Sequence, residues 1–249
     1  MKLHLIKYEI RNIIGNFYVA LFGLILPIFL GAVIPFGVLR QIPDPFKETV
    51  LNSIVLSMAI IIPMCVGFIG YGASYAQELE KKIPLRFKLF GISNRDFLMS
   101  KFIGQFAVVT LSLIIYFLAM YFIHGVHPVN LKGSLIYFAF LYIFTLAFIM
   151  MAHAIADMIG RFGPTYAVVM AIYFFFMFIS GSMGLRYEDF PDFLKKISDV
   201  FPLAFFGNES INIWQDKLTQ YGPLIQSTLT LLVIASLLLL VASYKRRKI

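Results

Sequence analysis

The stretch ELEKKIPLRFKLFGISNRDFLMSK, residues Glu78–Lys101, is the most highly charged segment of the chain. It lies between two long stretches, Thr49–Gln77 and Phe102–Leu131, that contain no charged residue at all. Membrane proteins commonly place basic segments of this kind at the cytoplasmic surface, next to their spanning helices. The pattern therefore predicts two membrane spans joined by a cytoplasmic loop that is placed to contact a soluble partner.

Charge-free intervals of 24 to 30 residues recur along the whole chain. A spanning helix needs about 20 apolar residues, so each interval holds one span. Only 14% of the 249 residues are charged, against roughly a quarter in soluble domains. The composition predicts an all-α integral membrane protein, a single transmembrane domain over residues 1–249, with spans in the intervals Asn12–Leu39, Thr49–Gln77, Phe102–Leu131, Gly133–Ala156, Phe162–Leu185 and Leu218–Tyr244.

The basic residues predict which way the chain is oriented. With a cytoplasmic N-terminus, 14 of the 21 Lys and Arg residues fall in the inner segments, and seven fall in the outer loops. The positive-inside rule favours this orientation, in which both termini are cytoplasmic. The net charge of +8 then reflects topology and attraction to anionic lipid head groups, and a nucleic-acid-binding surface is not expected.

Two amphipathic segments lie outside the six spans. Residues 2–14 place Leu3, Ile6 and Ile10 on one helical face, which predicts an interfacial (elbow) helix before the first span. The alternative is a frayed basic tail. Residues 184–217 predict two short helices that re-enter the outer leaflet between spans five and six. In the first of these, Asp189 is expected to cap the helix and Pro191 to occupy its first turn.

Several kinds of chemistry are absent from the sequence. No charged side chain lies within the expected spans, which weighs against an ion-coupled carrier. The HExxH and GxxxxGK[ST] motifs are also missing. The single Cys65 offers neither a disulfide framework nor a cysteine metal site, and His124 and His127 lack further ligands nearby. No metal is expected.

Two alternatives remain open from the residues alone. The first is an intramembrane enzyme that uses Ser182 and His153, with Asp157 one helical turn from His153. Ser182 lacks a G-x-S-x-G context, so a packing or turn role is favoured, and the His153 and Asp157 pair is interpreted as a helix-end pair. The second alternative is an ATP-independent channel or membrane scaffold.

The charged loop has the signals of a short helix followed by a long one. Pro84 suits a helix first turn, Leu85–Phe90 predicts the helix itself, and Gly91 is able to stop it. Ser93 is then expected to cap the helix that leads into the third span, with Asp96 at the capping-box position. An ordinary anchored basic loop is the alternative interpretation of this segment.

The sequence resembles the permease subunits of type-2 ABC exporters along its whole length. Six spans follow an amphipathic entry helix, and the loop between spans two and three is similar to that family's coupling loop at Glu78, Glu80, Leu85–Phe90, Ser93, Arg95 and Lys101. The outer segment is similar to the family pattern at Ser180-Gly181, Pro191, Leu194, Ile197-Ser198 and Pro202-Leu203. The coupling loop departs from the family pattern at Ile83-Pro84 and Gly91, where the family often has Gly-Thr and Pro.

This resemblance implies a permease that works as a dimer, with a second and identical permease subunit and two copies of a separate ATPase. ATP and Mg²⁺ would bind the ATPase, and this chain would bind no cofactor and have no catalytic site. The expected cargo is a hydrophobic or amphipathic peptide, lipid or drug leaving a bacterial plasma membrane, with antimicrobial peptide export favoured. Walls rich in Phe, Met and Tyr offer few polar groups to a hydrated sugar.

The resemblance also implies roles for particular residues. Pro84 is expected to take part in the coupling. The residues expected to insert into a groove of the ATPase are Leu85, Phe87, Leu89 and Phe90. Arg86 and Lys88 would make peripheral charged contacts, while Glu78 and Glu80 would hold the loop against the entry helix. The residues expected to form an outer gate are Phe190, Phe193, Ile197, Phe201 and Pro202.

Overall fold

The computed structural model describes residues 3–128, 130–180 and 190–247, and all the regular elements in those ranges are helical. Six of the described helical segments are long and apolar enough to cross a membrane, as the charge-free intervals predict. They are Phe17–Gln41, Asp44–Glu80, Asn94–His124, Leu131–Ile159, Phe162–Ile179 and Gly222–Lys245. The six-span, all-α fold class is therefore confirmed.

The first span is irregular where the sequence places its prolines. It consists of α2 (Phe17–Ala20), a π-helical turn (Leu21–Ile25), α3 (Leu26–Val38) and a 3₁₀ turn (Leu39–Gln41). Pro27 is the second residue of α3, just after the π turn. Proline has no N–H to donate and its ring pushes away the carbonyl one turn earlier, so the regular hydrogen-bond ladder shifts at this point.

The second span is the longest and the most buried of the six. It joins α4 (Asp44–Ala59), a π-helical segment (Pro63–Gly70) that begins at a proline, and α5 (Tyr71–Glu80). At 1.5 Å per residue its 37 residues are roughly 55 Å long, which exceeds a bilayer core of about 30 Å. The charge-free intervals leave residues 40–48 as the connection between the first two spans. This connection is shorter in the structure, because Asp44 and Pro45 begin α4.

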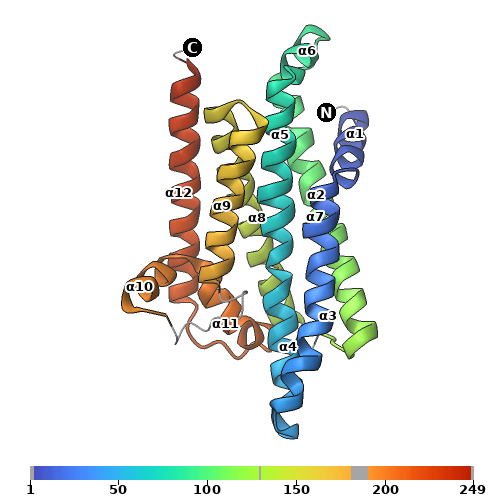
Figure 1. Ribbon diagram of the computed structural model, residues 1–249, viewed down its shortest axis with the longest axis vertical. Helices are drawn as coiled ribbons and strands as arrows, with labels where there is room; N and C mark the ends of the chain where they lie inside the picture. The colour runs from blue at the N-terminus through green and yellow to red at the C-terminus, as the bar shows by residue number, and fades with distance from the viewer. Residues whose placement is uncertain (1–2, 129, 181–189, 248–249) are drawn as a thin grey trace.

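Of the four long helices that remain, α7 (Asn94–His124), α8 (Leu131–Ile159) and α9 (Phe162–Ile179) pack on the second span, and α12 (Gly222–Arg247) packs mainly on α8. The N-terminal helix α1 (Leu3–Ile14) lies against α7. Figure 1 shows α1, α6 and the C-terminal end of α12 at one end of the bundle, and α10 and α11 at the other. The charged loop and the outer segment of the sequence thus lie at opposite ends.

The small residues of the second span lie at helix contacts. A Cβ on Gly70 would be 2.4 Å from a methyl carbon of Val19, and one on Gly72 would be 3.2 Å from Val169. A Cβ on Gly67 would be 3.4 Å from the Thr145 carbonyl oxygen of α8. Small residues allow helices to approach closely in lipid, and these glycines have that packing role.

The segment between spans five and six forms α10 (Asp192–Val200) and α11 (Pro202–Trp214). Pro191 is the N-cap of α10, one residue before the first turn where it was expected, and Asp189 lies outside the described residues. Helix α11 continues through Gly207 and Asn208, where the Ser57 hydroxyl donates to the Gly207 carbonyl and the helix packs on α4 and α8.

Candidate functional site

The candidate site is α6 (Ile83–Leu89), at the end of the bundle opposite α10 and α11. It begins two residues earlier and ends one residue earlier than the predicted helix Leu85–Phe90. Lys82 has a left-handed φ of 55°, which turns the chain after α5 and lets the helix start at once. Pro84 occupies the first turn, where its missing N–H leaves no hydrogen bond unmade.

Gly91 ends α6 in the way the sequence predicts. Its φ of 76° is left-handed, and its N–H donates to the Lys88 carbonyl, while the Ile92 N–H donates to the Phe87 carbonyl. These two bonds form a Schellman motif, which satisfies the last carbonyls of the helix. The C-terminal end of α6 is therefore capped by the chain's own N–H groups.

The third span begins directly after α6. Ser93 is the N-cap of α7, and its hydroxyl oxygen accepts the Asp96 N–H at 3.0 Å. The same hydroxyl donates to the Asp96 carboxylate at 2.9 Å. The predicted cap is confirmed, so α6 and α7 are joined by a short and well-ordered turn.

The two faces of α6 differ in exposure. Leu85, Leu89 and Phe90 are 55%, 79% and 80% exposed, and the cationic Arg86 and Lys88 are exposed beside them. An apolar surface of this kind has no covering partner within the described chain, which is typical of a binding surface.

Phe87 does not belong to the exposed face, which corrects its expected insertion into a partner. Its ring contacts Tyr8 of α1 at 6.1 Å and Phe97 of α7 at 5.4 Å between centroids. Positions 85 and 89 share one face because they are four residues apart, and position 87 therefore points the other way. Phe87 anchors α6 to the bundle.

A buried charge cluster, Glu9, Glu78 and Lys101, lies beneath α6. Lys101 Nζ is 2.7 Å from Glu78 Oε1 and 3.0 Å from Glu9 Oε2, and each of the three residues is at most 4% exposed. The cluster ties α1, α5 and α7 together at the point where the charged loop leaves the bundle. Asn12 of α1 adds a long hydrogen bond of 3.5 Å to Glu78.

The two acidic residues of the loop have different partners. Glu78 contacts α1 through Asn12, but Glu80 accepts the Phe162 N–H at 2.9 Å at the start of α9. The expected contact of Glu80 with the entry helix is therefore wrong. A helix N-terminus offers free N–H groups and a positive dipole, which makes it a better partner for this carboxylate.

Glu9 is a residue that the sequence analysis missed. The bundle-facing positions of α1 are Leu5, Glu9 and Ile13, spaced four residues apart, whereas Leu3 is 79% exposed. The signal was present, because an acid stood at regular spacing between two apolar residues. Burial and the nearby carboxylates of Glu78 and Glu9 raise the pKa of the Tyr8 phenol, so Tyr8 adds no charge beside the cluster.

The expected outer-gate residues do not form one surface. Phe190 is buried and stacks on Phe178 at 5.5 Å, and Phe201 packs edge-on against Phe176 at 5.3 Å. Pro202 is buried at the start of α11, whereas Phe193 is 64% exposed and Ile197 is half-buried. Phe190 and Phe201 lie against α9, and Phe193 points away from the core.

His153 and Asp157 belong to a polar cluster between α5 and α8. The Tyr71 hydroxyl lies 2.8 Å from His153 Nδ1, and the Tyr75 hydroxyl donates to Asp157 at 2.9 Å. His153 Nε2 is 3.5 Å from the Asp157 carboxylate. Ser182 lies outside the described residues, and within those residues no group of three His, Cys, Asp or Glu side chains is placed to hold a metal.

These features define a class: a multi-pass helical membrane protein with a capped, partly apolar helix, α6, exposed at one end. The model of the ABC-2 family transporter proteins matches residues 41–245, and the chain belongs to that family. It is therefore a transport permease, and members of the family generally work with an ABC ATPase.

A relative with a similar length supports the assignment. The chain is 24% identical over 247 residues to the "Putative transport permease YvfS" of Bacillus subtilis (strain 168), covering 96% of this chain and 94% of that protein. No solved structure matches the chain.

Proposed function

We propose that the chain is the membrane subunit of an ATP-driven exporter and that α6 is the helix held by a separate ATPase subunit. The observation that carries this proposal is the exposed apolar surface of Leu85, Leu89 and Phe90, on a helix capped at its C-terminal end. Burying such a side chain stabilises a complex by roughly 1.5–3 kcal/mol. Arg86 and Lys88 flank this face and suit an acidic rim on the partner.

The way α6 is attached supports its role in transmitting force. Phe87 fixes it to α1 and α7, and three residues separate its last residue from the cap of α7 at Ser93. On the other side it follows α5, the end of the central span. A push on α6 therefore moves the second and third spans together, because Lys101 and Glu78 join them by a buried ion pair.

The proposal includes an orientation, a stoichiometry and a cargo class. The α6 end faces the cytoplasm of a bacterial cell, where 14 of 21 basic residues then lie, with both termini on that side. Two identical permease subunits bind two ATPase subunits, which carry ATP and Mg²⁺. The cargo is hydrophobic or amphipathic, which walls rich in Phe, Met and Tyr favour over a hydrated sugar. An antimicrobial peptide is the class favoured by the resemblance to small six-span exporters.

The test is co-purification from membranes of the source cell. We expect the wild-type chain to retain, in equal amounts, a protein that contains the GxxxxGK[ST] phosphate loop. Leu89→Glu places a charge in the proposed contact and should remove that protein. Leu3→Glu is the matched control, because Leu3 of α1 is also 79% exposed at the same end of the bundle.

Two results would overturn the proposal. One is retention of the ATPase at wild-type strength by the Leu89→Glu variant. The other is transport by the purified chain alone in lipid vesicles, which would favour an ATP-independent channel. Stimulation of ATP hydrolysis by a panel of peptides, lipids and drugs then tests the cargo class separately from the partner.

A further inference from the structure

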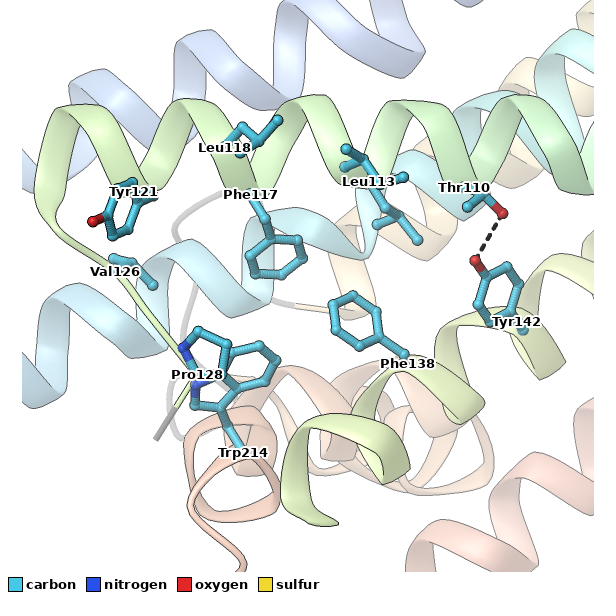
Figure 2. A pocket seen from close by; sticks show the side chains of 11 residues that line it. Thr110, Leu113, Phe117, Leu118, Tyr121, Val126, Pro128, Phe138, Tyr142 and Trp214 are labelled. Carbon is cyan, nitrogen blue, oxygen red and sulfur yellow. Dashed lines mark hydrogen bonds between the residues drawn. The ribbon is translucent and has the colours of Figure 1, made fainter. Parts of the chain in front are cut away.

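A groove of about 570 Å³ runs along α7 in the half of the molecule opposite α6. Figure 2 shows its walls, with α7 on one side and, across from it, Phe138 and Tyr142 of α8 and Trp214 of α11. The volume lies in the range of about 300–1,000 Å³ that is usual for ligand sites. Several lining residues of α7 are exposed, including Ile114 and Leu118, so the groove opens on the side of the bundle.

The wall made by Trp214 is held rigidly. Its ring stacks on Phe117 with 5.6 Å between centroids and 5° between planes, and it meets Phe138 edge-on at 5.9 Å. The backbone behind it lies so close to Gly133 that a Cβ there would be 2.5 Å from the Trp214 carbonyl oxygen. The groove is therefore a preformed feature of the packed helices.

The length and depth of the groove match one leaflet of a bilayer. Thr110 lies near the middle of α7 and Tyr121 lies one turn from its end, and both line the groove. Tyr121 is eleven positions beyond Thr110 along the helix, a rise of roughly 16 Å. One leaflet contributes about half of a hydrocarbon core of about 30 Å, so a single acyl chain spans the same distance.

The polar groups at the inner end of the groove are already paired. The Thr110 hydroxyl donates to the Phe106 carbonyl at 2.8 Å, so the Tyr142 hydroxyl, 2.7 Å away, donates to Thr110. Between that pair and Tyr121 the described α7 and α8 lining is hydrocarbon and aromatic. A peptide in this space would leave its backbone N–H and C=O groups without partners, which is costly in lipid.

The other end of the groove has one buried donor that is unpaired among the described residues. This donor is the indole Nε1 of Trp214. Trp and Tyr are enriched at the level of lipid head groups, and Tyr121 and Trp214 line the groove near this end. These two aromatic side chains place the ester of a bound lipid at this end of the groove.

We propose that this groove binds one acyl chain of a membrane phospholipid, with the chain end at Thr110 and Tyr142 and the ester near Trp214. The occupant is a hydrocarbon chain because the length, the apolar lining and the paired inner hydroxyls all fit one. This inference goes beyond the proposed function, since it requires only a bilayer and no ATPase.

The test uses the fluorescence of Trp214, which is the only tryptophan of the chain. Phosphatidylcholine brominated on its acyl chain is titrated into the purified full-length protein in detergent, with unbrominated lipid as the blank. Bromine quenches an indole that it touches. We expect quenching that saturates at one site per chain.

Two variants and a matched control make the test specific. Ile114→Phe and Leu118→Phe enlarge exposed side chains that line the groove, while Leu111→Phe enlarges an exposed α7 side chain that does not line it. The half-saturating lipid concentration should rise about tenfold in the first two, as expected when roughly two methylene groups lose their burial. It should not change in the control.

The outcomes divide cleanly. Quenching that rises linearly without saturation, or that is the same in all four proteins, would overturn the proposal. So would weakened self-association in Ile114→Phe and Leu118→Phe with unchanged quenching, because the groove would then be covered by a second copy of the chain.

Discussion

Lys101 Nζ lies 2.7 Å from Glu78 Oε1, although α6 and its turns separate these two residues along the chain. Both side chains are almost fully buried, and Glu9 from α1 makes a second contact with the same ammonium at 3.0 Å. The site thus holds two carboxylates and one ammonium at the base of α6. Lys101 balances one of the two negative charges, and it does so only while all three helices stay together.

Replacing the lysine should be the most damaging change in this cluster. Lys101→Met leaves two buried carboxylates without their cation, and breaking a buried pair in this way costs about 3–5 kcal/mol. Thermal unfolding in lipid discs should show a large loss of stability. Lys88→Met removes an exposed cation of α6 and should leave the unfolding temperature unchanged.

Neutralising one acid should be milder than removing the lysine. Glu9→Gln or Glu78→Gln leaves one carboxylate paired with Lys101, so no uncompensated charge remains in the cluster. We expect each variant to unfold at a higher temperature than Lys101→Met. If either glutamine variant lowered the unfolding temperature as much as Lys101→Met or more, the individual ion pairs, and not the charge balance, would set the stability.

Phe87 and Leu89 should separate anchoring from partner contact. Phe87→Ala removes a half-buried ring that contacts Tyr8 and Phe97, and should cost roughly 1–3 kcal/mol, less than the full core value. Leu89→Ala removes an exposed side chain and should leave the stability of the chain alone unchanged. Its effect should appear only in coupling to the ATPase, measured as cargo-stimulated ATP hydrolysis.

Gly133→Ala should disturb the end of the molecule opposite α6. The added Cβ would be 2.4 Å from the Ile213 carbonyl oxygen, so α8 and α11 must separate, at a cost of about 1–3 kcal/mol. Gly37→Ala is the matched control, because a Cβ there meets nothing within 4 Å. Unfolding temperatures of the two variants should differ, and equal values would contradict the close approach.

The spans could be predicted from sequence because the membrane imposes a local rule. Backbone groups in lipid must bond within the helix and charges are excluded, so charge-free intervals alone identify the helices. The caps at Ser93 and Gly91 were also predictable, since each depends on residues within a few positions. The start of the second span at Asp44 was missed because two neighbouring prolines were interpreted as a loop, although proline also begins helices.

Side-chain partners could not be predicted in the same way. The Glu80 carboxylate accepts the Phe162 N–H at the start of α9, and Phe162 is 82 residues away in the chain. Phe87 and Leu89 are similar in the sequence, and only the packing of α1 and α7 decides that one is anchored and the other exposed. The α7 groove likewise depends on a distant residue, because Trp214 closes a space between the consecutive helices α7 and α8.

The most direct test of the central claim, that a separate ATPase holds α6, is cross-linking from Leu89→Cys. The native Cys65 is buried, so a photoreactive maleimide should label the introduced thiol selectively. We predict, after illumination of membranes, a cross-link to a protein that contains GxxxxGK[ST], and none from Leu3→Cys. Cross-links from Leu89→Cys to lipid alone, with no such protein attached, would contradict the account.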